Sequence, residues 1–324
     1  MIDAALIAQA AAVLKAGGLV GMPTETVYGL AADASRAETI GKIYAAKGRP
    51  SDHPVIVHLA HIEQIRDWAI EIPAQAWVLA KAFWPGPMTL ILKRAPHVLD
   101  AVTGGQDTVG LRIPSHPVAH ALLAAFGGGV AAPSANKFGR VSPTTAQHVV
   151  DEFGDAVDIV LDGGASAVGI ESTIVDCSGA ALRILRPGAV TATMIAEVLG
   201  REEGVALHRK EKAPRVSGSL DAHYAPRTRL LLIAPEALAA AIAQYASQPL
   251  AVLSRARPAA FNGEWRPAAA DPAGYARDIY ARLRELDGVN AALMLIEAPP
   301  QGAEWDGIND RLRRAAFGSG DMQP

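Results

Sequence analysis

Residues 47–59 read KGRPSDHPVIVHL and carry the chain from a helix, through a stiff polar turn, into a strand. Upstream of this stretch apolar residues recur at helical spacing, and Gly48 is suited to end that helix. Pro50 follows at once and cannot continue a helix. The continuous apolar run Val55–Leu59 then predicts a buried strand. A helix that leads through a short turn into a buried strand indicates an α/β fold.

The two cations in this stretch, Lys47 and Arg49, admit two interpretations. Cations suit the negative end of a helix macrodipole, so the pair could serve only to end the helix. Alternatively, cations held beside a rigid turn could bind an anion. The rest of the chain has to decide between the two.

The same mixture of strands and helices continues on both sides. Further strands are predicted at Leu19–Met22, Thr89–Leu92, Val109–Ile113, Ile159–Leu161, Ser172–Asp176 and Leu182–Leu185. The capping-box pattern SRAE predicts that the helix before Gly48 begins at Ser35. Ser142, followed by a proline, predicts the start of another helix that ends at Gly154. A third helix is expected from Thr191 to Gly200.

The chain changes character at residues 201–226, where mixed charge gives way to small polar residues and then to HYAP. Strands are predicted beyond it at Leu230–Ile233, Leu250–Leu253 and Ala291–Ile296, and helices from Pro235, at Asp271–Leu286 and near Ile308–Ala316. This order predicts a small parallel sheet with crossover helices. We therefore expect a larger domain at 1–205, a linker at 206–228 and a C-terminal α/β domain at 229–324.

The composition limits the classes of function. Half of the 324 residues are hydrophobic, 19% are charged and the net charge is −3, so a basic site for nucleic acid or membrane would have to be local. The one cysteine, Cys177, cannot form an internal disulfide, and it reads as a buried thiol. The N-terminus reads as an amphipathic helix and not as a signal peptide. We expect a cytoplasmic protein.

Cations and small hydroxyl residues gather in loops and at strand ends of the first domain. This set of cations, hydroxyl residues and neighbouring polar residues comprises Thr26, Lys47, Arg49, His58, Thr108, Arg112, Ser134, Asn136, Ser142, Ser172 and Arg186. Each alone fits a plain structural role such as a cap or a solvated strand end. Together they fit a small polyanionic ligand, because charge-assisted hydrogen bonds contribute about 1.5–3 kcal/mol each. Neither a Walker-type phosphate loop nor an activated nucleophile motif accompanies them.

These segments, in this order, resemble the YrdC-domain family. The matching segments are PTETVYGL (23–30), KGRPSDHPVIVH (47–58), TVGLRIP (108–114), APSAN (132–136), GRVSPT (139–144), GIESTIVD (169–176) and RPGAV (186–190). The chain after residue 226 resembles the extra C-terminal domain of the long form of that family. The fold implied is a twisted mixed-sheet α/β domain with a concave basic cleft, followed by a smaller Rossmann-like parallel α/β domain.

The resemblance implies an activity. Members condense L-threonine, bicarbonate and ATP, with Mg²⁺ on the triphosphate, to give threonylcarbamoyl-adenylate and diphosphate. A separate transferase then moves the threonylcarbamoyl group to the adenosine beside the anticodon of certain tRNAs. The expected partners are therefore these substrates and the downstream transferase proteins, with tRNA met indirectly at most and no membrane.

The resemblance also implies roles for individual residues. The ATP site would comprise Lys47, Arg49, His53, Thr108, Ser134, Asn136, Ser142, Arg186 and Val216, and the threonine site Thr26, His58, Arg112, Ala132 and Ser172. Lys47 and Arg49 would hold the phosphates, and His58 would act either as a general base or as an anchor. The linker residues His223 and Tyr224 would lie over the cleft as a lid. His53 departs from the family, which usually has Asn there, and Val216 would contact nucleotide through its backbone.

Two other functions remain open at the level of sequence. A carbamoyl-adenylating enzyme that uses carbamoyl phosphate could share the same cleft, although this chain lacks the acylphosphatase-like and zinc-finger segments expected of it. An RNA-binding or ribosome-maturation module is the alternative outside enzymes. It predicts an affinity that falls steeply with salt and ignores threonine.

Overall fold

The computed structural model describes residues 3–201, 213–218 and 220–320. The chain forms two compact units, and each is described by itself. The first consists of Met1–Lys137 and Pro143–Ser219, and the second of Phe138–Ser142 and Leu220–Pro324. The expected domain boundary after residue 205, and the linker residues 206–212 and 219, lie outside the described residues. The three-part division therefore stays a prediction.

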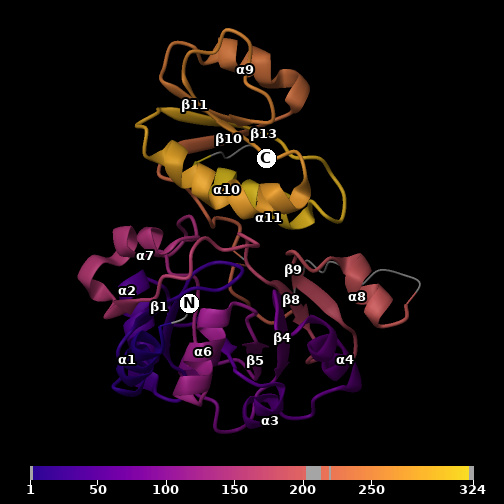
Figure 1. Ribbon diagram of the computed structural model, residues 1–324. Helices are drawn as coiled ribbons and strands as arrows, with labels where there is room; N and C mark the ends of the chain where they lie inside the picture. Colours follow the sequence, from indigo (N-terminus) through magenta and orange to yellow (C-terminus); the bar gives the residue numbers. More distant parts are fainter. Residues whose placement is uncertain (1–2, 202–212, 219, 321–324) are drawn as a thin grey trace. The chain divides into compact units, whose positions relative to one another are not determined.

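A mixed sheet forms the centre of the first unit (Figure 1), with the strand order β7-β1-β2-β6-β3-β5-β4-β8-β9 over its described residues. Its strands are β1 (Val20–Met22), β2 (Gly29–Asp33), β3 (Ile56–His58), β4 (Met88–Lys93), β5 (Thr108–Arg112), β6 (Val130–Ala131), β7 (Ile159–Val160), β8 (Thr173–Asp176) and β9 (Arg183–Arg186). The pairs β1–β7, β3–β5 and β4–β8 are parallel and the other neighbours are antiparallel. The predicted mixed α/β fold is confirmed.

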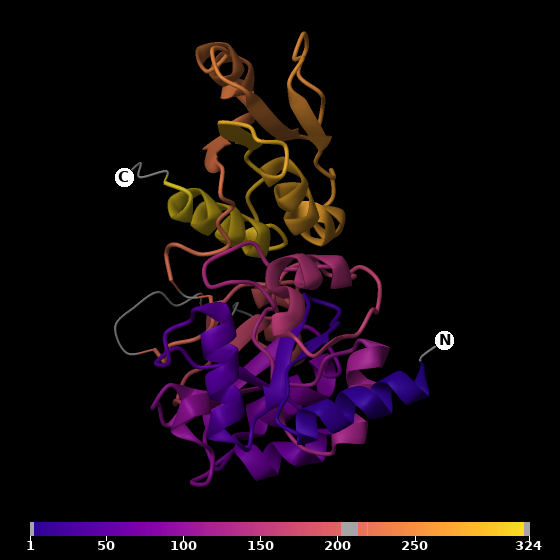
Figure 2. The ribbon, with the colours of Figure 1, turned by 90° about the vertical axis from the view of Figure 1, so that its left-hand side faces the viewer.

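Helices connect and cover these strands. They are α1 (Ala4–Lys15), α2 (Ala37–Lys47), α3 (Ile65–Trp68), α4 (Ala74–Phe83), α5 (Asp100–Thr103), α6 (Pro117–Phe126), α7 (Ala146–Phe153) and α8 (Ala192–Val198), with short 3₁₀ turns at Ile62–Gln64 and Gly154–Ala156. Figure 2 shows α1, beside the N-terminus, packed along α6. None of the helices in the described part of the chain combines the length and the apolar character that a membrane span requires.

The predicted start of α2 at Ser35 is wrong. The helix begins at Ala37, and Arg36 precedes it as the N-cap without a capping side-chain bond. The backbone N–H and the hydroxyl of Ser35 both donate to Asp33 Oδ1, at 2.8 and 2.7 Å. Ser35 is therefore part of a tight turn that follows β2, because a nearby carboxylate competes with the helix for its donors.

The predicted start of α7 at Ser142 is also wrong. The helix begins three residues after the proline, at Ala146, and Thr145 caps it by accepting a hydrogen bond from His148 N at 3.3 Å. Pro143 is instead held in the turn before the helix, since its carbonyl accepts from Tyr28 N at 2.9 Å. The predicted cap at Thr191 is confirmed, because its hydroxyl accepts from Met194 N at 3.2 Å.

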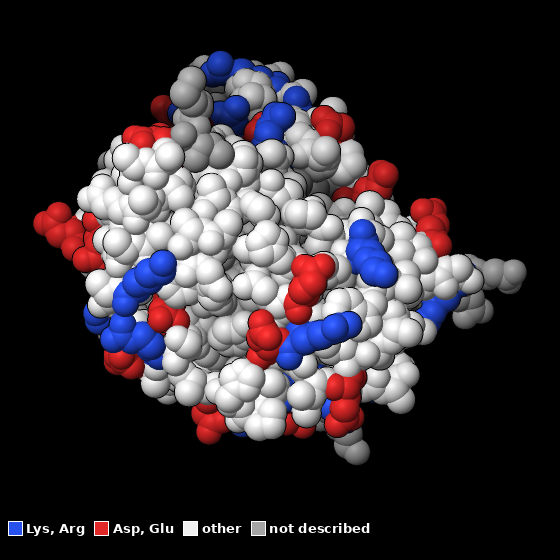
Figure 3. All heavy atoms as spheres, turned by 60° about the horizontal axis from the view of Figure 1, so that its bottom comes forward, with Lys and Arg blue, Asp and Glu red and all other residues white. Residues whose placement is uncertain are grey.

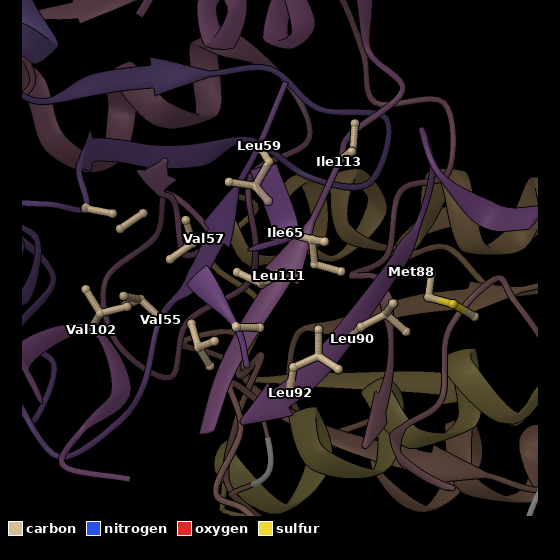
Figure 4. Close-up of a cluster of buried hydrophobic side chains, with 14 of the residues drawn as sticks. Val55, Val57, Leu59, Ile65, Met88, Leu90, Leu92, Val102, Leu111 and Ile113 are labelled. Carbon is tan, nitrogen blue, oxygen red and sulfur yellow. The ribbon is translucent and has the colours of Figure 1, made fainter. Parts of the chain in front are cut away.

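Strands β3, β4 and β5, which are neighbours in the sheet, turn one face towards the main core and the other face away from it. Side chains at alternate positions enter the core (Figure 4), namely Val55, Val57, Leu59, Met88, Leu90, Leu92, Leu111 and Ile113. The intervening positions, which belong to the opposite face because side chains alternate along a strand, are Ile56, His58, Thr89, Ile91, Thr108 and Arg112. Most polar residues singled out in the sequence on these strands thus share one face.

The second unit contains a parallel sheet in the order β10-β13-β11-β12 over its described residues. Its strands are β10 (Arg229–Ile233), β11 (Leu250–Ser254), β12 (Glu264–Pro267) and β13 (Leu293–Glu297). Its helices are α9 (Leu238–Gln244), α10 (Pro272–Asp287) and α11 (Asp306–Gly318), with a 3₁₀ turn at Pro235–Ala237. Figure 1 shows α9 on one face of the sheet and α10 and α11 on the other. The predicted parallel sheet with crossover helices is confirmed.

A glycine at the start of β6 tests how tightly the core is packed. A Cβ atom at Gly129 would lie 2.2 Å from the ring of Trp68 and 2.8 Å from Val57. We therefore expect Gly129→Ala to lower the free energy of unfolding by about 1–3 kcal/mol. Gly41 in α2 is the matched control, because a Cβ there meets nothing within 4 Å. Gly41→Ala should stabilise by about 0.5–1 kcal/mol in the same urea titration. Equal stability of the two variants would contradict the packing.

Candidate active site

Lys47, the last residue of α2, turns its side chain into the first unit and is 2% exposed. Its ammonium donates to the carbonyl oxygens of Ser134 and Asn136, each at 2.5 Å. Gly48, at φ 62°, ends the helix there. Burial, with the nearby Arg49 charge as a further cause, lowers the pKa of Lys47 well below its usual value. Three residues predicted for the ATP site therefore lie together, two of them through their carbonyls.

Arg49 and Arg186 meet the same short segment of chain. Arg49 Nη2 donates to Pro54 O at 2.7 Å and to Ser217 Oγ at 3.1 Å. Arg186 Nη1 donates to Ser217 O at 2.9 Å. The backbone next to Val216 is thus held between two cations predicted for the ATP site. Ser217 had no assigned role, and its signal in the sequence was only its place beside Val216.

Ser172 connects this network to β4. Arg186 Nη2 donates to its hydroxyl at 3.1 Å and to its carbonyl at 2.9 Å. The hydroxyls of Ser172 and Thr89 lie 2.8 Å apart in a hydrogen bond. Thr89 was predicted only as a strand residue. Its alternation with the buried core positions of β4 is the signal that could have placed it on the site face.

Arg112, the last residue of β5, has its guanidinium fixed on three sides. Nη1 donates to Thr26 Oγ1 at 2.8 Å, and Nε donates to Gly86 O at 3.2 Å. Nη2 lies 2.7 Å from Glu25 Oε1, in an ion pair whose side chains are 5% and 8% exposed. Sequence reasoning gave Glu25 no role. The available signal was that Glu25 is the only acidic residue of the loop PTETVYGL, in a domain whose predicted site residues include several cations.

His58 pairs with Arg112 in the register of β3 and β5 and is buried. Its Nδ1 has no hydrogen-bond partner within the described parts of the chain. Burial, and then the Arg112 charge, lowers the pKa of His58 to about 3. The imidazole is therefore neutral and a weak proton acceptor at neutral pH. This favours the anchor over the general base that the sequence left open.

The buried His58 should make stability depend on pH. Its pKa is about 3 in the folded protein against 6.5 without the fold, so between these values the unfolded chain binds a proton that the folded chain does not. Stability then falls as the pH drops from 6.5 towards 3, by about 1.4 kcal/mol per unit. We expect His58→Asn to lose about 2 kcal/mol less than the wild type between pH 7 and pH 5 in urea unfolding. If the free energy of unfolding changed with pH in the same way in both proteins, water would have to reach the His58 ring.

A narrow, mainly apolar pocket lies next to these cations. Its lining includes Thr108 and Val216 together with Ile56, Ile91 and Ile174. Three isoleucines and a valine there form a small cluster separate from the main core. The same pocket reaches Pro54 and Ser217, which both accept hydrogen bonds from Arg49. Thr108 and Val216, both predicted for the ATP site, therefore line one pocket.

His53 and Ala132 are the remaining predicted residues of the first unit, and each makes a backbone hydrogen bond. The His53 carbonyl accepts from the hydroxyl of Tyr44 at 2.8 Å, and partial burial, together with the Arg49 charge, lowers the pKa of the His53 ring. Ala132 N donates to Ile56 O at 3.0 Å, and this bond fixes the backbone at a position predicted for the threonine site.

Three predicted residues belong to the second unit. The Ser142 carbonyl accepts from Arg284 Nε at 3.4 Å. His223 and Tyr224 are buried, with ring centroids 4.1 Å apart, and Tyr224 stacks on Tyr280 at 5.7 Å. The predicted roles of Ser142 in the ATP site and of the other two as a lid stay predictions.

The buried thiol of Cys177 is no candidate nucleophile for this site. Burial raises the pKa of the Cys177 thiol to about 12, so the thiol stays protonated as the sequence analysis expects of a structural cysteine. Across residues 3–201, 213–218 and 220–320, no group of three His, Cys, Asp or Glu side chains could hold a metal ion. The site offers cations, hydroxyls and carbonyls.

A buried set of cations and hydroxyls on one face of a mixed sheet, with a parallel α/β unit after it, defines a two-domain protein of the YrdC class. The family model "Telomere recombination" matches residues 12–188. The model "Threonylcarbamoyl-AMP synthase, C-terminal domain" matches residues 190–317. The resemblance stated from the sequence motifs is confirmed.

Two curated relatives carry the name threonylcarbamoyl-AMP synthase. The threonylcarbamoyl-AMP synthase of Bacillus subtilis is 38% identical, over 96% of this chain and 93% of its own. That of Pyrococcus abyssi is 40% identical, over 69% of this chain and 66% of its own. The crystal structure of P. abyssi Sua5 complexed with L-threonine superposes with a TM-score of 0.92 at 33% identity, covering 98% of this chain and 96% of that one. The chain belongs to the threonylcarbamoyl-AMP synthase family.

Proposed function

We propose that this enzyme condenses L-threonine, bicarbonate and ATP to threonylcarbamoyl-adenylate and diphosphate. Its family membership makes it an adenylate-forming enzyme of the nucleotidyltransferase type. The observation that carries the proposal is the buried set Lys47, Arg49, Arg112 and Arg186, each bonded to a hydroxyl or a carbonyl on one side of the sheet. Guanidinium and ammonium groups held in this way suit an anionic substrate, because they can form charge-assisted hydrogen bonds with phosphate and carboxylate oxygens.

The ATP half of the proposal rests on Lys47, Arg49 and Arg186. Their charges would hold the triphosphate and neutralise the diphosphate as it leaves. Thr108 and Val216, which line the narrow pocket beside these cations, would contact the adenosine. Mg²⁺ would arrive bound to the triphosphate oxygens, as this ion usually does in sites that lack a carboxylate cage.

The threonine half rests on Arg112, Thr26, Ser172 and His58. The guanidinium would bind the threonine carboxylate by charge-assisted hydrogen bonds. The buried His58 Nδ1, unpartnered within the described chain, would accept or donate one bond to the substrate. The L-threonine complex of P. abyssi Sua5, which superposes over nearly the whole chain, supports threonine as the substrate.

The chemistry requires no nucleophile from the protein. The threonine amine attacks the bicarbonate carbon, and water leaves as the carbamate forms. A carbamate oxygen then attacks the α-phosphorus of ATP and displaces diphosphate. Holding the partners in line can lower the barrier by about 7–11 kcal/mol. Lys47 and Arg49 would supply most of the charge stabilisation.

The product serves a second enzyme in this proposal. A downstream transferase would take the threonylcarbamoyl group from the adenylate to the adenosine beside the anticodon of tRNA, in the cytoplasm. The face drawn in Figure 3 carries most of its Lys and Arg side chains singly, several of them next to acidic ones. That face offers no broad basic surface for an RNA backbone.

Diphosphate release measures the proposed reaction directly. The purified protein with ATP and bicarbonate should release diphosphate only when L-threonine is added, and it should form threonylcarbamoyl-adenylate in equal amount. Release that depends on carbamoyl phosphate would instead establish the carbamoyl-adenylating alternative. Tight, salt-sensitive RNA binding without turnover would establish the RNA-binding alternative.

A further inference from the structure

Glu25 is a buried acid for which the proposed reaction has no assigned use. It lies in the loop between β1 and β2, between Thr24 and Thr26. Its Oε1 makes the 2.7 Å ion contact with Arg112 Nη2. Beyond that contact, neither carboxylate oxygen has a hydrogen-bond partner in the described chain. A carboxylate offers about four acceptor positions, so most of the capacity of Glu25 is open.

Arg112 does not need Glu25 to be held in place. Its Nε and Nη1 are bonded to Gly86 O and Thr26 Oγ1, and its backbone is part of β5. A guanidinium has five N–H donors, so these two bonds and the ion contact leave two donors for a further carboxylate. Arg112 can therefore bind a substrate carboxylate while it stays beside Glu25.

The charge balance of this pair suits a zwitterion. Arg112 and Glu25 together are neutral, and the neighbouring His58 adds no charge when it is unprotonated. A carboxylate bound alone would leave a net negative charge buried, which is unfavourable. An α-amino acid adds no net charge, because its ammonium can face Glu25 while its carboxylate faces Arg112.

We infer that Glu25 binds the α-ammonium of the amino-acid substrate, so that Arg112 and Glu25 together recognise the zwitterion. This inference rests on the proposed function, and it names the residue that selects an α-amino acid over an α-hydroxy acid of the same shape. The reaction needs that selection because only an amine can form the carbamate.

A purely structural Glu25 predicts a different result. If the carboxylate served only to neutralise Arg112, its removal would free the guanidinium for any carboxylate. Glu25→Gln would then tighten the binding of amino and hydroxy acids alike. If Glu25 served only to keep the loop folded, the same variant would weaken both ligands by the same factor.

Calorimetric binding distinguishes these cases with two ligands, L-threonine and the 2,3-dihydroxybutanoate in which a hydroxyl replaces its amine. We expect the wild type to prefer L-threonine by about tenfold to a hundredfold, the worth of one charge-assisted hydrogen bond. Glu25→Gln should abolish that preference by weakening threonine alone. Glu71→Gln is the matched control, because Glu71 is an exposed partner of Lys93, and it should keep the preference.

A preference that survives Glu25→Gln, or equal shifts for both ligands, would overturn the inference. If this variant does not fold, the wild type decides: its affinity for threonine, unlike that for the hydroxy acid, must fall as the pH rises through the pKa of the threonine ammonium. A constant ratio would overturn the inference as well. Failure of the proposed function looks different, since the wild type would then release no diphosphate with threonine.

Discussion

Arg112→Met is expected to lower the free energy of unfolding by about 3–5 kcal/mol, because it leaves the Glu25 carboxylate buried without its counter-charge. Methionine keeps most of the apolar stem but offers no donor, so Thr26 Oγ1 and Gly86 O also lose a partner. Equilibrium unfolding in urea measures the loss.

A double variant separates charge from packing in this result. Arg112→Met combined with Glu25→Gln removes both charges, so most of the lost stability should return. Binding of L-threonine should not return with it, since the carboxylate still lacks a guanidinium. A double variant as unstable as Arg112→Met alone would mean that packing, and not the unpaired acid, causes the loss.

Lys47→Met is expected to lower the rate of adenylate formation by at least about 100-fold. The ammonium of Lys47 is fixed by two carbonyls of the segment APSAN, so it would present a preorganised positive charge to the triphosphate. Methionine fills the same space without the charge. The rate of threonine-dependent diphosphate release at saturating ATP measures the effect.

Lys42→Met is the matched control for this variant. Lys42 lies in the same helix and donates to Gly17 O at 2.6 Å, but it is remote from the predicted phosphate site. It should keep near-normal turnover. Thermal unfolding of both variants shows whether a loss of activity is a loss of fold. A folded Lys47→Met protein with normal turnover would remove Lys47 from the phosphate site.

The strand at Val55–Leu59 could be predicted because its apolar run is continuous. Val57 and His58 are neighbours in the chain, yet one enters the core and the other belongs to the site face, because strand side chains alternate. The strand Gly29–Asp33 escaped prediction since all five residues are buried and four of them are glycine or short side chains without a period. The strand Glu264–Pro267 was not predicted either, because it is a short edge strand that ends in proline.

The site residues were predicted through motifs, while their partners were not. Lys47 was chosen as a phosphate ligand, but nothing in its segment says that it donates to the carbonyls of Ser134 and Asn136. Their roles towards substrate stay predictions. The helix starts at Ser35 and Ser142 were wrong because tertiary or turn hydrogen bonds competed with the caps.

The sequence by itself determined where most of the strands lie, the class of the two domains and the set of cations and hydroxyls, since all of these are local patterns. Only the tertiary structure decided which groups meet. Arg49 contacts Ser217 across 168 residues of chain, and Arg112 contacts a glutamate to which no motif gave a role. Strand order decides which of these groups come together. Burial makes an ion contact between them strong and an unpaired carboxylate costly. Neither strand order nor burial can be deduced from a single segment of the sequence.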